Sequence, residues 1–292
     1  MKPTTANSKF SIDFIILAIA ILAISTSGPL ITITAAPAIA IAFWRCFLGS
    51  VATAPFAFKN GLRNINKKTF LTSASAGLLL GIHFAVWIPS LRFTTVAAST
   101  AMVATQPAWA ALIARIRGER FPNKVWFGIF VALSGALLLT GIDISLDRKA
   151  VIGDLLALLG AIFAALYVTV GQSARTKLTT AQYTVIAYAS AAFALLVLAI
   201  VTGTNLSGFS RQAWFYIFLL TLLAQILGHT LFNITLRSLS ATVVSMGILF
   251  EMPGSTIIAA IAIGQIPPWQ TLPAIALLMV GMFYVVTGYK TK

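Results

Sequence analysis

Residues 155–170 read LLALLGAIFAALYVTV, and this stretch decides the fold class. It has no charged side chain and no alternation of apolar and polar residues with period two, which a membrane-spanning β-strand would show. An α-helix needs about 20 apolar residues to cross a hydrocarbon core of roughly 30 Å, and runs of that length recur along the chain. The sequence therefore predicts an all-α, polytopic membrane protein.

The composition agrees with a chain that is embedded in lipid. Of its 292 residues, 59% are hydrophobic and 9% are charged, whereas soluble domains carry about 25% charged residues. Ten transmembrane helices are predicted, and the connections between them are too short to hold a soluble domain. The approximate spans are 12–34, 37–57, 70–91, 94–114, 125–142, 152–172, 182–203, 213–236, 240–262 and 270–289.

The basic residues are distributed unequally between the predicted connections. With the N-terminus inside, fifteen of the 20 Lys and Arg residues fall in inner segments and four in outer segments, while Arg45 lies within a span. This bias follows the positive-inside rule, so we expect a multi-pass protein of the cell (cytoplasmic) membrane with both termini in the cytoplasm. Topology thereby explains the net charge of +14, and no nucleic-acid partner is predicted.

Two segments of the chain are similar to one another. GIHFAVWIPSLRFTTVAASTAMVATQPAWAALIARIRGERFP (81–122) aligns with GHTLFNITLRSLSATVVSMGILFEMPGSTIIAAIAIGQIPP (228–268). Pro107 and Pro253 are 146 positions apart, which is also the separation between the histidines of the two segments. The chain therefore contains an internal repeat.

The repeat divides the chain into two five-helix halves, 1–148 and 149–292. Because five is an odd number, the second half must be inserted upside down relative to the first. Inverted repeats of this kind commonly place a binding site near the membrane midplane, where a rocking motion exposes it to each side in turn. The predicted architecture is thus ten transmembrane helices arranged as two inverted five-helix repeats.

Several stretches resemble EamA-type transporters of the drug/metabolite transporter superfamily, and together they cover essentially the whole chain. The stretches are AFWRCFLGSVATAP (42–55), LRFTTVAASTAMVATQPAWAALIARIRGERFP (91–122), GALLLTG (135–141), LRSLSATVVSMGILFEMPGS (236–255) and VGMFYVVTG (280–288). The chain departs from the family pattern at AISTSGPL (23–30), where a Trp-Gly pair is frequent, and at Gly264-Gln265, where Gly-Glu is common. The resemblance implies export or import of amino acids, other metabolites or drugs, with export the commoner habit, through a cavity between the third, fourth, eighth and ninth spans.

Polar and aromatic residues lie at mid-depth in those four spans. His83 and Trp87 are four positions apart and share one helix face, and Gln225, His229 and Asn233 repeat that spacing. The fourth and ninth spans contribute Met102, Thr105, Gln106, Trp109, Gly247, Glu251 and Ser255. We expect the four helices to form the walls of one cavity. The residues expected to bind substrate there are His83, Trp87, Gln106, Trp109, His229, Asn233 and Glu251, together with Arg45 of the second span.

Glu251 is the only charged residue in the mainly apolar run from Ala241 to Ile263. A charge at the centre of a span costs about 2.5–3.5 kcal/mol on insertion scales, so such a residue normally faces a cavity or a partner. Three interpretations remain open: Glu251 binds a cationic group of the substrate, accepts and releases a coupling proton, or pairs with Arg45. The last is plausible because Arg45 is also near mid-depth, and burying two opposite charges together costs less than burying either alone.

The other candidates have structural alternatives. His83 and His229 either pack as hydrogen-bonded residues or help to move protons, since histidine titrates near neutral pH. Two histidines and one glutamate on separate helices match no metal-binding motif, so no metal or cofactor is predicted. Pro107 and Pro253 lie at equivalent depths, where they act either as hinges or as static kinks.

The sequence has no Gly-rich phosphate loop, no His-Glu-x-x-His and no Gly-x-Ser-x-Gly, so an enzyme is not predicted. We predict a secondary carrier that works by alternating access on zwitterionic, cationic or aromatic solutes such as amino acids or amines. A channel-like or facilitative pore without ion coupling is the alternative, although no ring of like charges or filter sequence is present. Ten helices can enclose a path in one chain, so a monomer is expected.

Overall fold

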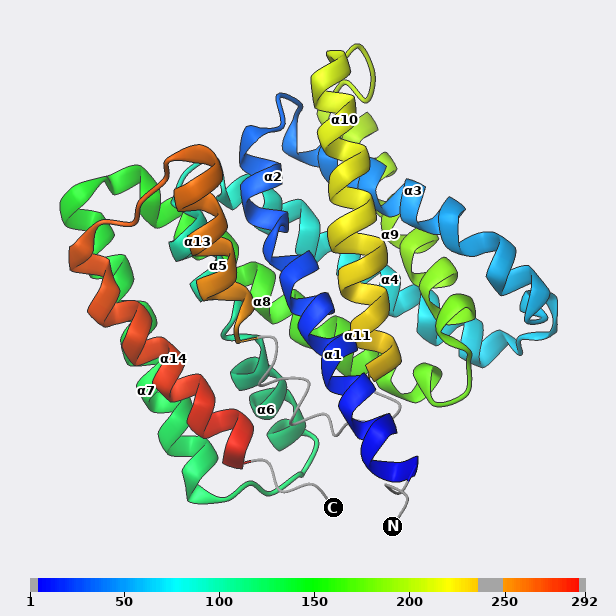
Figure 1. Cartoon of the computed structure of the whole chain (residues 1–292), viewed down its shortest axis with the longest axis horizontal. Coiled ribbons are helices and arrows are strands. Elements are labelled where there is room, and N and C mark those ends of the chain that lie inside the picture. The colour runs from blue at the N-terminus through cyan, green and yellow to red at the C-terminus, as the bar shows by residue number, and fades with distance from the viewer. Residues whose placement is uncertain (1–4, 236–248, 289–292) are drawn as a thin grey trace.

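The computed structural model describes residues 5–235 and 249–288, and every regular element in these ranges is helical (Figure 1). The elements of the first half are α1 (Thr5–Ser25), α2 (Ser27–Ile33), α3 (Ala38–Lys59), η1 (Leu62–Asn64), α4 (Lys67–Ser90), α5 (Val96–Val103), α6 (Gln106–Ile116) and α7 (Asn123–Leu146). The elements of the second half are α8 (Arg148–Arg175), α9 (Thr180–Thr202), α10 (Arg211–Leu220), η2 (Thr221–His229), α11 (Thr230–Thr235), α13 (Glu251–Ile263), η3 (Trp269–Thr271) and α14 (Leu272–Gly288).

Within the described ranges, 9 helical segments are long and apolar enough to cross a membrane. Each begins and ends within a few residues of one of the predicted spans. The predicted span 240–262 lies partly outside the described residues, and its second part is the shorter apolar helix α13. The prediction of an all-helical polytopic membrane protein is therefore confirmed.

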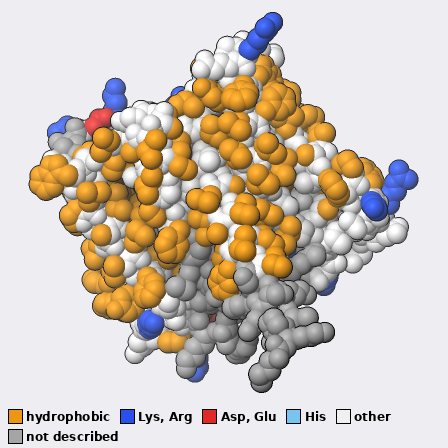
Figure 2. Space-filling view, in the orientation of Figure 1, with side chains coloured by type: hydrophobic (Ala, Val, Ile, Leu, Met, Phe, Trp, Pro, Cys, Tyr) orange, Lys and Arg blue, Asp and Glu red, His pale blue; other side chains and the backbone are white. Residues whose placement is uncertain are grey.

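The surface has the character of a lipid-facing protein. Figure 2 shows apolar side chains over most of the visible face, with Lys and Arg side chains at its margins. Large apolar side chains point outward from the middle of the helices, including Phe130 (71% exposed), Leu137 (75%) and Phe193 (64%). Such an extended apolar surface is unfavourable in water but suits a hydrocarbon environment. In Figure 1, α1 begins and α14 ends at the same end of the bundle.

Local signals in the sequence determine where the helices begin and end. Thr95 caps α5 by accepting a hydrogen bond from the backbone nitrogen of Ala98, at 3.1 Å. Thr179 and Gln182 form a capping box at the start of α9. At the other end of α9, Gly203 adopts a φ of 64°, a left-handed conformation that glycine takes without steric cost.

The contacts between helices follow a two-fold pattern. The third span (α4) packs on the sixth (α8), and correspondingly the eighth (η2 and α11) packs on the first (α1). The second span (α3) packs on the seventh (α9), and the fifth (α7) on the tenth (α14). Exchanging the two halves maps each of these pairs onto another pair or onto itself, as a two-fold relation between repeats requires. The division of the chain between residues 148 and 149 stays a prediction.

Small residues allow the closest helix pairs to approach backbone to backbone. On α7, a Cβ added to Gly135 would lie 2.6 Å from the backbone nitrogen of Leu278 on α14. On α14, a Cβ added to Gly281 would collide with the backbone nitrogen of Ala132. Gly135 and Gly281 are related by the repeat offset, so the α7–α14 contact is nearly symmetric. Without a hydrophobic driving force between helices in lipid, such close packing is a main source of association.

Three spans predicted as single helices are interrupted. The first divides into α1 and α2 at Thr26, and the fourth divides into α5 and α6 at Ala104 and Thr105. The eighth contains a π-helix, η2, between α10 and α11. Interrupted backbone at membrane depth is tolerated where it is buried in protein or lines a cavity. These three interruptions therefore indicate where a functional centre is to be sought.

Candidate functional site

A buried arginine contacts two of these interrupted spans, the first and the eighth. Arg45 of α3 is 0% exposed. Its Nε donates a hydrogen bond to Oε1 of Gln225 in η2, at 3.0 Å, and its Nη1 donates to Oγ of Ser27 in α2, at 3.4 Å. Its guanidinium carbon lies 4.1 Å from the centroid of the Phe84 ring in α4. A desolvated cation–π contact of this kind stabilises by about 2 kcal/mol.

Phe84 is the hub of an aromatic group around Arg45. The ring centroid of His83 lies 4.9 Å from that of Phe84, and the centroids of Trp87 and His229 lie at 6.2 Å and 6.3 Å. The structure thus brings together three predicted site residues on the eighth and third spans with Arg45 on the second. We call the following residues the central cluster: Ser27, Arg45, His83, Phe84, Trp87, Gln225 and His229.

The orientation of His83 is fixed by two contacts. Its Nδ1 lies 2.8 Å from the carbonyl oxygen of Gly160 in α8, and because a carbonyl oxygen only accepts, Nδ1 carries the hydrogen. The ring also stacks on Trp87, with centroids 5.6 Å apart and an interplanar angle of 10°. In the neutral ring, Nε2 is therefore the acceptor. The packing and the chemical interpretations of His83 both agree with this arrangement.

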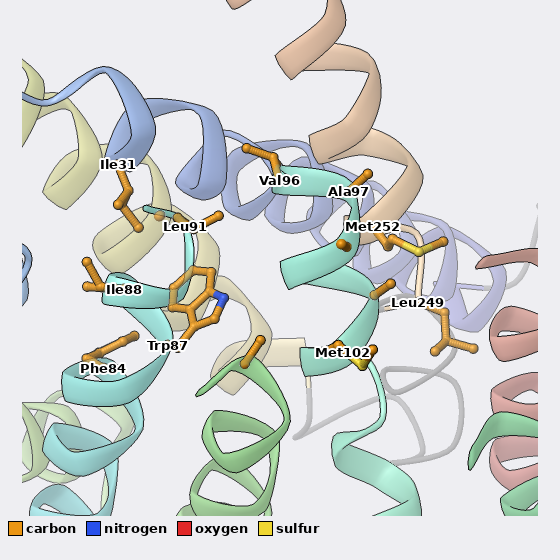
Figure 3. Close-up of a cluster of buried hydrophobic side chains, with 14 of the residues drawn as sticks. Ile31, Phe84, Trp87, Ile88, Leu91, Val96, Ala97, Met102, Leu249 and Met252 are labelled. Atoms are coloured by element: carbon orange, nitrogen blue, oxygen red, sulfur yellow. The ribbon is translucent and has the colours of Figure 1, made fainter. Parts of the chain in front are cut away.

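Trp87 is held by a chain of hydroxyl groups. Its Nε1 donates to Oγ of Ser99 at 3.1 Å, and the Ser99 and Ser90 hydroxyl oxygens are 2.7 Å apart. Oγ of Ser90 in turn donates to the carbonyl oxygen of Trp87, at 2.6 Å. Figure 3 shows Trp87 beside Phe84 and Ile88 on α4, with its indole nitrogen directed toward α5. Trp87 thus joins the third span to the fourth.

Glu251 is the first residue of α13 and is partly exposed. In the described part of the chain, its carboxylate makes neither a hydrogen bond nor an ion pair, so the structure does not form the Arg45–Glu251 pair. Its backbone carbonyl accepts a hydrogen bond from Oγ of Ser25 at 3.4 Å, and Oγ of Ser255 donates to the carbonyl oxygen of Ser25 at 2.7 Å. The end of α1 is therefore tied to the start of α13.

The junction between α5 and α6 in the fourth span corresponds, through the repeat, to the start of α13. Thr105, which the repeat aligns with Glu251, is buried at the α5–α6 junction and accepts a hydrogen bond from Nε1 of Trp109 at 3.0 Å. Gln106 begins α6 and is partly exposed. Pro107 and Pro253 each lie in the first turn of a helix, where proline is tolerated because its missing N–H has no partner there. Their roles as hinges stay predictions.

Part of the polar stripe predicted for the eighth span lies in a π-helix, Thr221–His229, which has i→i+5 hydrogen bonding. Residues four positions apart lie close to one face in a π-helix as they do in an α-helix. Gln225 contacts Arg45 and His229 contacts Phe84, so both reach the central cluster. The structure describes the backbone of Asn233 within α11, but its side chain and all of Gly247 lie outside the described residues.

Gln225 was expected in the polar stripe of the eighth span, but its hydrogen bond with Arg45 was not predicted. The contact between Phe84 and Arg45 was not predicted either. Asp154 of α8 is a second carboxylate within a span, 1% exposed, and its Oδ1 accepts a hydrogen bond from Oγ1 of Thr94 at 3.1 Å. Asp154 lies near the N-terminus of α8, away from the central cluster.

Two hollows at the surface lie apart from the central cluster. One has a volume of about 560 Å³ and the other of about 240 Å³. They lie where α4 begins and are lined by residues that include Lys67, Lys68, Thr72, Asn60, Asn66 and Gln182. Neither hollow is lined by a residue of the central cluster.

Comparison with known proteins shows which family this sequence matches. The sequence model of the EamA-like transporter family matches residues 10–141 and 151–287. A relative from Archaeoglobus fulgidus, described as an uncharacterized transporter, is 22% identical over 236 residues, which cover 79% of this chain and 81% of the relative. A solved structure described as "Crystal structure of protein" is similar with a TM-score of 0.64 and 20% identity, over 94% of this chain and 97% of that one. The last similarity concerns the fold alone.

Proposed function

Because the chain belongs to the EamA-like transporter family of the drug/metabolite transporter superfamily, we propose that it is a secondary carrier that moves small metabolites by alternating access. The proposed direction is export, and the proposed cargoes are amino acids, amines or drug-like solutes. The lipid bilayer and the small-molecule substrate are its partners, and it works as a monomer without a cofactor and without enzymatic activity.

One observation carries the proposal. Breaks in the first, fourth and eighth spans and the start of α13 occur beside charged or polar side chains at membrane depth. Carriers built from inverted repeats bind substrate at such discontinuous helices, because the freed backbone groups and the helix ends supply polar contacts. Buried ionisable residues within spans are costly and normally mark a substrate or ion pathway.

Counterflow distinguishes a carrier from the alternative of a channel-like pore. In liposomes with the purified protein and unlabelled solute inside, a carrier accumulates labelled solute transiently, and the rate saturates. A panel of labelled amino acids and amines is the appropriate set, with protein-free liposomes as the control. Flux that grows linearly with concentration and shows no counterflow would favour the pore instead. No flux of any solute would exclude the proposed cargo class.

Orientation in the membrane is testable with single cysteines. Cys46 is buried, so it should not react with polar reagents. We expect Ser207→Cys, in the exposed α9–α10 connection, to react in intact cells with a membrane-impermeant maleimide. Asn64→Cys, in the exposed α3–α4 connection, should react only after permeabilisation. The reverse pattern would place both termini outside.

A further inference from the structure

We propose that Arg45 and Gln225 form the subsite that binds the carboxylate of the substrate, so that the cargo is a zwitterion of the amino-acid type. This inference rests on the proposed function, since it names the substrate class of that same carrier. Glu251, at the other side of the break in the first span, faces the cationic end of the same substrate.

The two side chains offer hydrogen-bond donors that lack acceptors. Arg45 and Gln225 are both 0% exposed, yet Nη2 of Arg45 and Nε2 of Gln225 have no hydrogen-bond partner in the described part of the chain. The amide orientation follows from chemistry: arginine only donates, so the atom that faces its Nε must be the amide oxygen. Nε2 of Gln225 is therefore an NH₂ group, which donates hydrogen bonds. Buried donors without acceptors are rare and call for an explanation.

A carboxylate is the ligand that satisfies both donors. Two oxygens, each with two lone pairs, match a planar guanidinium edge and a neighbouring N–H group. It would also neutralise a buried cation whose compensation within the described residues is the Phe84 ring and two neutral oxygens. A purely structural arginine at this depth would be expected to have a carboxylate of the protein beside it.

The backbone at Gln225 is irregular. Gln225 lies within η2, and its carbonyl oxygen accepts hydrogen bonds from the Tyr188 hydroxyl at 3.3 Å and from Oγ1 of Thr230 at 3.5 Å. These side-chain hydroxyl groups satisfy a carbonyl that the α-helical ladder would otherwise use. π-Helical segments are rare and occur often at functional sites. The sequence thus maintains a distorted helix at the position of the amide.

The break in the first span connects the two charged residues. Ser27 accepts the hydrogen bond from Arg45, while Ser25, two residues earlier, donates to the backbone of Glu251. A substrate whose carboxylate is bound by Arg45 and whose ammonium group is bound by Glu251 would therefore lie along the residues 25–28. Closure of the site around a zwitterion would draw α3 and α13 together across this break.

The test is Gln225→Glu, which places a carboxylate of the protein next to Arg45. The variant keeps the size of the side chain and creates an ion pair at the position of the 3.0 Å hydrogen bond, so we expect it to fold. Its own carboxylate would compete with that of the substrate. We expect the affinity for an amino acid to fall by about tenfold to a hundredfold, the loss that charged hydrogen bonds predict. The matched control is Gln212→Glu, the same substitution at an exposed position of α10.

Binding is measured by thermal stabilisation of the detergent-purified protein with each of the common L-amino acids, and then with the amide and the decarboxylated amine of the strongest ligand. The proposal expects that the wild type and Gln212→Glu bind the amino acid at least tenfold more tightly than its amide, and that Gln225→Glu loses this preference. Arg45→Lys, which keeps the charge but lacks the planar fork, should also lose it. Equal binding of acid and amide, an unchanged preference in Gln225→Glu, or no amino-acid binding in the wild type would overturn the proposal.

The outcome is separable from that of the proposed function. Counterflow of amines together with equal binding of acids and amides would leave the carrier and remove the carboxylate subsite. Carboxylate-dependent binding that Gln225→Glu abolishes, without counterflow of any solute, would leave the subsite and remove the carrier.

Discussion

Glu251→Gln is expected to reduce counterflow at least tenfold while the amount of folded protein stays the same. The carboxylate makes no hydrogen bond or ion pair in the described residues, so the amide breaks no contact of the fold. A charge at this depth that lacks a partner among the described residues is costly, and we expect that function is the reason to retain it. Removing it should therefore weaken transport and leave folding unaffected.

The measurement is counterflow in liposomes, with the size-exclusion profile of the purified variant as the test of folding. Glu119→Gln is the matched control, because Glu119 is exposed in the α6–α7 connection. If the carboxyl also carries a coupling proton, a pH gradient should stimulate the wild type and leave Glu251→Gln unaffected. A well-folded variant with full transport would assign Glu251 a structural role. Aggregation of the variant would point the same way.

Gly281→Leu is expected to prevent assembly of the folded protein. The first added carbon already collides with the backbone nitrogen of Ala132 and lies 2.7 Å from the carbonyl oxygen of Gly128. Backbone atoms cannot rotate away as a side chain does, so α14 must separate from α7. Overpacking a core with methylene groups costs about 1–3 kcal/mol, and moving one helix off another should cost more.

The measurement is the yield of monodisperse protein after solubilisation in a mild detergent. Val280→Leu is the control on the same helix, since Val280 is 49% exposed toward lipid and has room for an added carbon. We expect normal yield from Val280→Leu and little or none from Gly281→Leu. Equal yields would mean that the α7–α14 contact is not needed for the fold.

The fold was predictable because the solvent dictates it. In lipid every backbone polar group must be satisfied within the chain, which leaves helices as the solution for apolar runs such as 155–170. The length of each apolar run then predicts the ends of a span to within a few residues. The interruptions were harder to predict. Pro107 gave a signal for the interruption of the fourth span, but no proline marks η2, whose distortion depends on contacts with Tyr188 and Thr230.

The residues of the candidate site could be recognised from the sequence, but the contacts between them could not. An arginine and a glutamate at mid-depth can be recognised by their cost, and the repeat places His83 and His229 at equivalent positions. Which groups touch depends on helix rotation, which a sequence does not give. Their similar depth left a pair of Arg45 and Glu251 as one of three interpretations, whereas the structure places Arg45 against Gln225 and Phe84. An aromatic ring among many apolar residues carries no sign that it contacts a cation.

The contact between α7 and α14 has a consequence for biosynthesis. The chain is made from its N-terminus, so α7 enters the membrane while more than one hundred residues that precede α14 are still to be translated. At about 5–20 residues per second the delay is on the order of ten seconds. During that interval the glycine face of α7 meets lipid or a membrane chaperone instead of its partner. The contact between α7 and α14 therefore forms late, and a ribosome that stops before α14 releases a chain in which the glycine face of α7 has no helix to pack on.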